Sequence, residues 1–179
     1  VADASPVPVI IYNVPMFTGI SMGASLMIEL AKHPNIYGLK ESAGNIQLIS
    51  EVGWGTLRDD FSILAGAAQT LCPTMMAGAS GGIVALACAV PAIMIRLYQA
   101  FASEDYSLAA TIQRIVAPAA VAVTATYGIP GLKAAMEYEG LKSGFPRRPL
   151  LPLGMSERKE LEKIIDQMKN QAAEIKLEY

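Results

Sequence analysis

The chain has 179 residues, of which 53% are hydrophobic and only 17% are charged, so we expect a folded domain with an ample apolar core. A net charge of −2 and an isoelectric point near 5.4 give no reason to expect nucleic acid or an anionic membrane as a partner. No apolar run reaches the roughly 18 residues of a transmembrane helix. We therefore expect the excess apolar surface to contact another protein chain.

Strands and helices are predicted to alternate in the first half of the sequence. Four short apolar runs, at residues 7–12, 36–40, 61–65 and 81–85, have the composition of buried strands. The stretches 22–32, 45–57 and 67–77 have apolar residues at helical spacing, and we interpret Met75 and Met76 as core residues. This alternation predicts βα units around a parallel sheet, an α/β fold.

The second half is predicted to be helical. Helices are expected over residues 91–102, over 105–126 with a kink at Pro118, and from Pro130 to about residue 138. Residues 142–154 are predicted to form a loop with a surface pair, Arg147 and Arg148. The last helix should begin at an N-cap Ser156, with Glu157 favourable at its amino end. Its apolar residues fall on one stripe: Leu161, Ile164, Ile165, Met168 and Ala172.

The chain has only two cysteines and one histidine, which limits the kinds of catalytic or metal site that it can form. Cys72 and Cys88 lack CxxC spacing and lie in an apolar context, so we expect buried, reduced thiols. His33 is the only histidine, and its neighbours Pro34 and Asn35 indicate a turn that ends a helix. A histidine-based metal centre or catalytic triad is therefore not expected, and we predict neither a metal nor another cofactor.

Lys40 ends the apolar run Ile36-Tyr37-Gly38-Leu39. A lysine at the end of a buried strand is unusual, because burying an unpaired charge is costly. One interpretation is a lysine that simply ends a strand and extends into solvent. The other is a Schiff-base lysine, because desolvation lowers the pKa of a lysine and leaves a neutral amine that attacks a carbonyl.

Tyr12 ends the preceding predicted strand, 28 residues before Lys40. Consecutive parallel strands of a βαβ unit place their carboxyl ends side by side. The side chains of Tyr12 and Lys40 should therefore lie close together at the same edge of the sheet. A phenol beside an imine-forming lysine can shuttle protons during carbinolamine formation, dehydration and carbon–carbon cleavage. Tyr12 alone also fits an interfacial tyrosine with a solvated hydroxyl, but the pair favours catalysis.

These residues resemble a known family. Tyr12-Asn13-Val14-Pro15 and Gly38-Leu39-Lys40-Glu41-Ser42 are similar to motifs of the dihydrodipicolinate synthase / N-acetylneuraminate lyase superfamily of pyruvate-dependent class I aldolases. Further similar segments follow in the same order along nearly the whole chain: Leu64-Ala65-Gly66, Gly78-Ala79-Ser80-Gly81-Gly82-Ile83 and Tyr127-Gly128-Ile129-Pro130-Gly131-Leu132-Lys133. The first two motifs are specific as a pair, whereas the glycine-rich ones alone are weak.

The resemblance implies a (β/α)8 barrel followed by a helical C-terminal region. Four βα units cannot close such a barrel, so we expect this chain to supply strands five to eight, with residues 1–89 as the second half of the barrel and 90–179 as its last helix and the helical region. The chain is then a fragment or truncated product that lacks the first four units. The barrel-interior face of its sheet would be exposed, which predicts aggregation or dependence on a complementary half.

By resemblance, Lys40 forms the imine with pyruvate and Tyr12 relays protons. Ser42 is expected to contact substrate or, equally well, to be a serine of the barrel interior, and Gly66 and Ile83 are expected to shape the pocket. The family's glycine-rich Thr/Ser loop for the pyruvate carboxylate and its second tyrosine are absent from this sequence. Activity of this polypeptide by itself is therefore in question.

Phe17 bears on the substrate. Dihydrodipicolinate synthases typically carry an arginine at this position to hold a carboxylate, and an aromatic ring makes no bidentate salt bridge. Phe17 therefore argues against lysine biosynthesis. The combined pattern of Ser5-Pro6-Val7-Pro8, His33-Pro34-Asn35-Ile36 and Tyr127-Gly128-Ile129-Pro130-Gly131-Leu132-Lys133 resembles more closely the 4-hydroxy-2-oxoglutarate aldolases, which yield pyruvate and glyoxylate. A dihydrodipicolinate synthase-type condensation is the alternative.

Two other functions compete with the enzyme. The chain is also consistent with an inert truncated paralogue that associates with full-length subunits. An open flavodoxin-like nucleotide binder has little support, since no strand is followed by a GxGxxG or Walker motif. The resemblance predicts a homodimer or homotetramer, and the missing units predict pairing with an N-terminal half-barrel. We expect the protein in the cytoplasm, or in mitochondria if a targeting peptide precedes the sequence.

Overall fold

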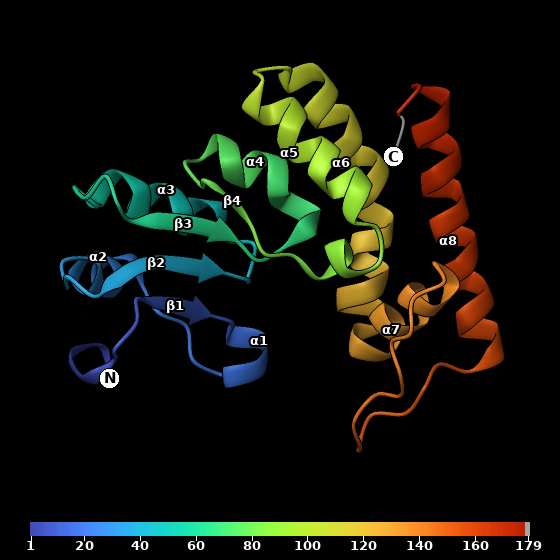
Figure 1. The fold of residues 1–179 in the computed structure, drawn as a ribbon, viewed down its shortest axis with the longest axis horizontal. Helices are drawn as coiled ribbons and strands as arrows, with labels where there is room; N and C mark the ends of the chain where they lie inside the picture. The colour runs from blue at the N-terminus through green and yellow to red at the C-terminus, as the bar shows by residue number, and fades with distance from the viewer. Residues whose placement is uncertain (178–179) are drawn as a thin grey trace. The chain divides into compact units, whose positions relative to one another are not determined.

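The computed structural model describes residues 1–177 and divides into two compact units, Val1–Ile83 and a second unit that begins at Val84 (Figure 1). The first unit is built around a sheet and the second is helical. In the first unit the elements are η1 (Ala2–Ala4), β1 (Val9–Asn13), α1 (Pro15–Thr18), α2 (Ala24–Ala31), β2 (Ile36–Glu41), α3 (Ile46–Gly55), β3 (Ser62–Ala65), η2 (Ala68–Thr70), α4 (Leu71–Met76) and β4 (Gly81–Gly82).

The four strands of the first unit pair side by side in sequence order, and every pair is parallel. Parallel neighbours need a crossover between them, and α2, α3 and α4 each lie in one of the three connections. The predicted α/β fold with a parallel sheet is therefore confirmed. All strand carboxyl ends point to the same edge of the sheet, which is where residues 12 and 40 were expected to meet.

One face of this sheet is covered and the other is not. Leu39 and Ile63 pack with Met27 of α2 and with Ile49 and Val52 of α3 in the core of the unit. Side chains alternate between the two faces of a strand, and the opposite face carries residues that remain half exposed, among them Ile10 and Tyr12 of β1. The expected apolar and accessible sheet face is thus present.

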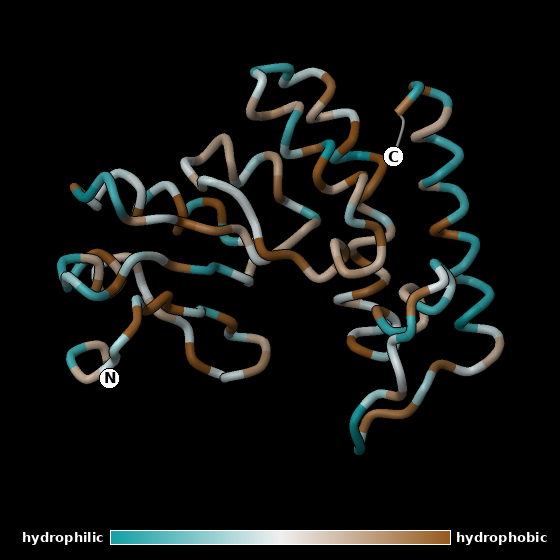
Figure 2. Tube along the Cα trace, viewed as in Figure 1, coloured by the Kyte–Doolittle hydropathy of each residue, from teal (hydrophilic) through white to brown (hydrophobic). Residues whose placement is uncertain are grey.

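The second unit contains η3 (Ala85–Cys88), α5 (Pro91–Ala102), α6 (Tyr106–Val121), the π-helical segment η4 (Ala122–Thr126), α7 (Gly128–Tyr138) and α8 (Met155–Glu174). Its core contains Ile93, Leu97, Ile112, Val116 and Leu161. Figure 2 shows α8 alternating between hydrophilic and hydrophobic residues, as a helix with one buried stripe should. The stripe residues Leu161, Ile165, Met168 and Ala172 are buried, as predicted.

The segment Tyr106–Thr126 is the one part of residues 1–177 that is long and apolar enough to cross a membrane, and half of its most apolar window is buried inside the fold. The core helix of a folded domain meets the same criterion, which is how we interpret it here. The helix runs through Pro118 as part of α6, and its hydrogen-bonding pattern changes only at Ala122.

Four local predictions are wrong. Met76, which was interpreted as a core residue together with Met75, is 60% exposed. The strand predicted at residues 81–85 ends at Gly82, because Ala85–Cys88 form a short 3-10 helix. Helix α8 begins at Met155 with Gly154 as its N-cap, so Ser156 lies inside the helix; Glu157 instead accepts a hydrogen bond from the Gly154 N–H at 2.8 Å. Cys88 is exposed rather than buried, whereas Cys72 is buried as expected.

Candidate active site

Lys40 and Tyr12 lie together at the carboxyl edge of the sheet. Each is the last residue but one of its strand, and their Cα atoms are register partners between β1 and β2. The Lys40 ammonium nitrogen lies 4.1 Å from the centre of the Tyr12 ring, a cation–π contact. The juxtaposition expected from the sequence is therefore present in the structure.

The pair is open to solvent and to small molecules. Tyr12 is 50% exposed and Lys40 is half-buried, so the amine is neither sealed in the core nor fully in water. The amine lies over the face of the Tyr12 ring. A carbonyl compound that enters at this edge meets a nucleophilic amine with an aromatic wall beside it.

Ser42 and Gly66 are in close contact beyond the ends of β2 and β3. A Cβ atom placed on Gly66 would lie 1.8 Å from Ser42 Oγ and 2.8 Å from the Glu41 carbonyl oxygen, so only glycine fits there. The Gly66 N–H donates to that carbonyl at 2.6 Å. Within the described residues, Ser42 Oγ is a buried hydroxyl without a hydrogen-bond partner. A buried hydroxyl without a hydrogen-bond partner is uncommon in folded proteins.

The other two predicted site residues occupy the rim of the same unit. Ile83 follows β4, is 53% exposed, and donates its N–H to the Ala65 carbonyl at 2.8 Å. Phe17 lies on the short helix α1 directly after β1 and is 74% exposed. Neither is packed into the core, so both side chains are accessible to solvent.

Sequence reasoning missed two buried polar residues, Asn13 and Glu41. They directly follow Tyr12 and Lys40, face one another as register partners, and are each only 2% exposed. Asn13 Nδ2 donates to Glu41 Oε1 at 3.3 Å. The signal was available, because a carboxylate in the last position of a buried strand needs partners.

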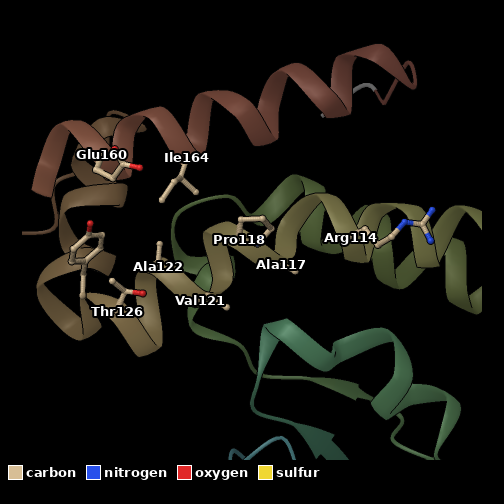
Figure 3. A pocket seen from close by; sticks show the side chains of 9 residues that line it. Arg114, Ala117, Pro118, Val121, Ala122, Thr126, Glu160 and Ile164 are labelled. Carbon is tan, nitrogen blue, oxygen red and sulfur yellow. The ribbon is translucent and has the colours of Figure 1, made fainter.

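A hollow of about 690 Å3 lies elsewhere, inside the second unit, and is lined by Arg114, Ala117, Pro118, Val121, Ala122, Thr126, Tyr127, Glu160 and Ile164. Figure 3 shows Ile164 of α8 pointing toward Ala122 and Pro118 across this hollow. Its lining is mostly apolar and contains none of the residues predicted for catalysis. Lys40 and the hollow therefore belong to different parts of the chain.

Comparison with known proteins identifies what the chain is similar to. The sequence model of the dihydrodipicolinate synthetase family matches residues 1–168. The 4-hydroxy-tetrahydrodipicolinate synthase of Methanosarcina barkeri is 36% identical over 170 residues, which cover 94% of this chain and 57% of that protein. That of Methanosarcina mazei is 37% identical over 162 residues, covering 90% of this chain and 55% of that protein.

Solved structures agree in fold. The dihydrodipicolinate synthase of Bacillus anthracis has a TM-score of 0.85 and 26% identity, covering 92% of this chain and 56% of that one. The dihydrodipicolinate synthase of Cyanidioschyzon merolae, solved with lysine bound, has a TM-score of 0.86 and 26% identity, covering 94% of this chain and 57% of that one. The chain thus spans somewhat more than half the length of these relatives.

Proposed function

This chain belongs to the dihydrodipicolinate synthetase family, and from that membership we propose that it carries the nucleophile of a class I aldolase, a carbon–carbon lyase that acts through a Schiff base. The observation that carries the proposal is the contact between Lys40 and Tyr12, 4.1 Å from nitrogen to ring centre, at the carboxyl edge of a parallel sheet. In barrels of parallel strands, this edge is where catalytic residues gather.

In the proposed reaction, the Lys40 amine attacks the C2 carbonyl of pyruvate, and the resulting carbinolamine loses water to form an imine. Loss of a proton from C3 gives an enamine, which attacks the carbonyl carbon of an aldehyde. Water then hydrolyses the product imine, releases the 2-oxo acid and regenerates the amine. Cleavage is the same sequence in reverse, and the Tyr12 hydroxyl carries the protons.

Two aldehydes are candidates for the acceptor. The names of the similar proteins favour a dihydrodipicolinate synthase-type condensation. Phe17 favours cleavage of 4-hydroxy-2-oxoglutarate to pyruvate and glyoxylate, because an exposed aromatic ring cannot pair with the carboxylate of a longer acceptor as a guanidinium would. Comparing the turnover of glyoxylate with that of aspartate semialdehyde separates the two.

The proposal includes a larger assembly. We infer that β1 to β4 are strands five to eight of an eight-stranded barrel, with residues 1–89 as its second half and 90–179 as last helix and helical region. The sequential strand order and the uncovered sheet face support this, as does the greater length of the relatives. A complementary half-barrel or a homo-oligomer would cover the open face. A cytoplasmic or mitochondrial location remains a prediction.

The deciding experiment is to incubate the chain with pyruvate and sodium borohydride, measure the intact mass, and map the modified peptide. We expect one reduced pyruvate adduct, confined to Lys40, and none in a Lys40→Arg variant. Absence of an adduct from folded protein, under conditions in which a full-length relative is labelled, would favour an inert paralogue over an autonomous aldolase. Adding the N-terminal half of a relative as a separate polypeptide tests whether completion restores labelling.

A further inference from the structure

A buried carboxylate joins the segments that present Lys40 and Tyr12. Glu41 Oε1 accepts hydrogen bonds from Asn13 Nδ2 at 3.3 Å and from the Ala43 N–H at 2.8 Å, while Oε2 accepts from the Asn45 N–H at 3.1 Å. Asn13 Oδ1 in turn accepts from the Met22 N–H at 3.3 Å. One acidic side chain thereby connects the end of β1, the end of β2 and the start of α3.

Backbone bonds extend the same junction. The Ser42 N–H donates to the Asn13 carbonyl at 3.0 Å, and the Gly66 N–H donates to the Glu41 carbonyl at 2.6 Å. The ends of three adjacent strands are therefore held through residues 13 and 41. Because these residues directly follow Tyr12 and Lys40, a shift of either backbone position moves the neighbouring functional side chain.

A contribution to folding stability does not by itself explain why the Glu41 carboxylate is buried. Glu41 is 2% exposed, and in the described part of the chain its hydrogen-bond donors are neutral groups and no ion pair includes it. Burying a carboxylate without a cation is costly, and buried charges are often replaced by apolar residues without loss of stability. Buried polar networks that are costly but fully bonded are typical of sites that need a defined geometry.

We propose that Glu41 is a positioning residue for the Schiff-base site, acting through the strand ends to hold the Lys40 amine against Tyr12. Side chains alternate along a strand, so Glu41 and Asn13 lie on the covered face while Lys40 and Tyr12 lie on the open face. Glu41 never meets the substrate in this arrangement. The inference deepens the proposed function and rests on it.

The test compares Glu41→Gln with Asn45→Ala in the full chain. Glutamine keeps one acceptor oxygen but turns an NH2 group toward an N–H donor, so it breaks the network at one point. Asn45→Ala removes the N-cap bond that the Leu48 N–H donates to Asn45 Oδ1 at 3.0 Å, yet keeps the Asn45 backbone N–H that donates to Glu41. It is therefore a matched control for lost stability in the same loop.

The first readout is the rate of borohydride-trapped adduct formation at Lys40 over a series of pyruvate concentrations, well below the unfolding temperature. We expect Glu41→Gln to lower the rate at saturating pyruvate about tenfold, since small misplacements of reacting groups are costly, with little change in half-saturation. Asn45→Ala should match the wild-type rate. Equal rates for Glu41→Gln and the wild type would overturn the inference while leaving the proposed function intact.

The second readout needs no pyruvate. After reductive methylation of the lysines with 13C-formaldehyde, the Lys40 methyl resonance, assigned with Lys40→Arg, should show a ring-current shift that Tyr12→Leu abolishes. Glu41→Gln should move this resonance toward its position in Tyr12→Leu, and Asn45→Ala should not. An unmoved resonance in Glu41→Gln contradicts the inference, even if wild-type protein forms no adduct and the proposed function fails.

Discussion

At the scale of single residues, the site is an amine held against an aromatic face. Lys40 and Tyr12 are register partners on neighbouring parallel strands, which places their side chains on the same face of the sheet. The contact is made by the ring of Tyr12, whereas the proposed proton relay uses its hydroxyl. The two contributions can therefore be separated by mutation.

Tyr12→Phe should slow adduct formation at Lys40 by about 10²-fold, the low end of the range for a general acid–base group, while leaving the ring contact in place. Tyr12→Leu should also abolish the ring contact. Single-turnover trapping with pyruvate measures the rates, and the 13C-methyl resonance of Lys40 reports the contact. A Tyr12→Phe variant that reacts at the wild-type rate would remove the hydroxyl from the mechanism.

Gly66→Ala should destabilise the first unit by about 1–3 kcal/mol, the usual cost of overpacking. The new methyl group would lie 1.8 Å from Ser42 Oγ and 2.8 Å from the Glu41 carbonyl oxygen. Urea denaturation measures the loss. Adding Ser42→Gly removes the first clash only, so the double variant should recover part of the stability; no recovery would mean that the backbone contact dominates.

The two cysteines should differ in reactivity. Burial raises the pKa of the Cys72 thiol, which lowers its thiolate fraction at any pH below that raised value, whereas Cys88 is exposed. In native protein at mildly alkaline pH we expect iodoacetamide to modify Cys88 well before Cys72. Mass spectrometry of tryptic peptides reads this directly, with urea-unfolded protein as the control in which both react.

At the scale of elements, two helices, α3 and α6, begin at short polar side chains that cap them. Asp105 Oδ1 accepts the Leu108 N–H at 3.0 Å at the start of α6, and Asn45 does the same for α3. Helix α8 uses a different solution, in which Glu157 bonds back to Gly154. These caps satisfy N–H groups that have no partner within the helix.

Asp105→Ala should lower the stability of the second unit by about 0.5–2 kcal/mol through loss of the cap. Asp105→Ser, which retains a cap oxygen, should stay within a few tenths of a kcal/mol of the wild type. Thermal unfolding followed by circular dichroism compares the three proteins. Equal losses in both variants would indicate a role for the negative charge rather than for the hydrogen bond.

At the scale of the whole molecule, the chain leaves one sheet face accessible. Ile10 and Tyr12 are each 50% exposed on that face, and large accessible apolar patches mark interaction or aggregation surfaces. In the proposed assembly, further strands of a barrel or another subunit occupy this face. Whether this sheet face is an association surface can be tested without knowledge of the partner.

We expect the isolated chain to self-associate in a concentration-dependent manner in sedimentation velocity, because association removes the exposed apolar face of its sheet from water. Ile10→Gln should weaken that association. Leu57→Gln, at a 96% exposed position outside the sheet, is the matched control and should leave it unchanged. If the two variants behave alike, the sheet face is not the associating surface.

The sequence by itself determined most of the helices and strands, the parallel sheet, the family and the proximity of Lys40 and Tyr12. These follow from local signals, namely apolar periodicity, turn residues and two motifs that surround Lys40 and Tyr12. The helix over Pro91–Ala102 was predicted to the residue, since a proline starts it and the apolar spacing continues to its end. The shortest strand was harder to predict from the sequence, because Gly81–Gly82 has no side chains and so shows no alternating pattern.

Only the tertiary structure decided how that pair is held. Glu41 and Asn13 lie within the two motifs, but their pairing as bonded partners depends on the register between β1 and β2. The requirement for glycine at residue 66 likewise depends on Ser42, which approaches from another strand end. Contacts of this kind join residues far apart along the chain, so they follow from the packing of whole strands rather than from local preference.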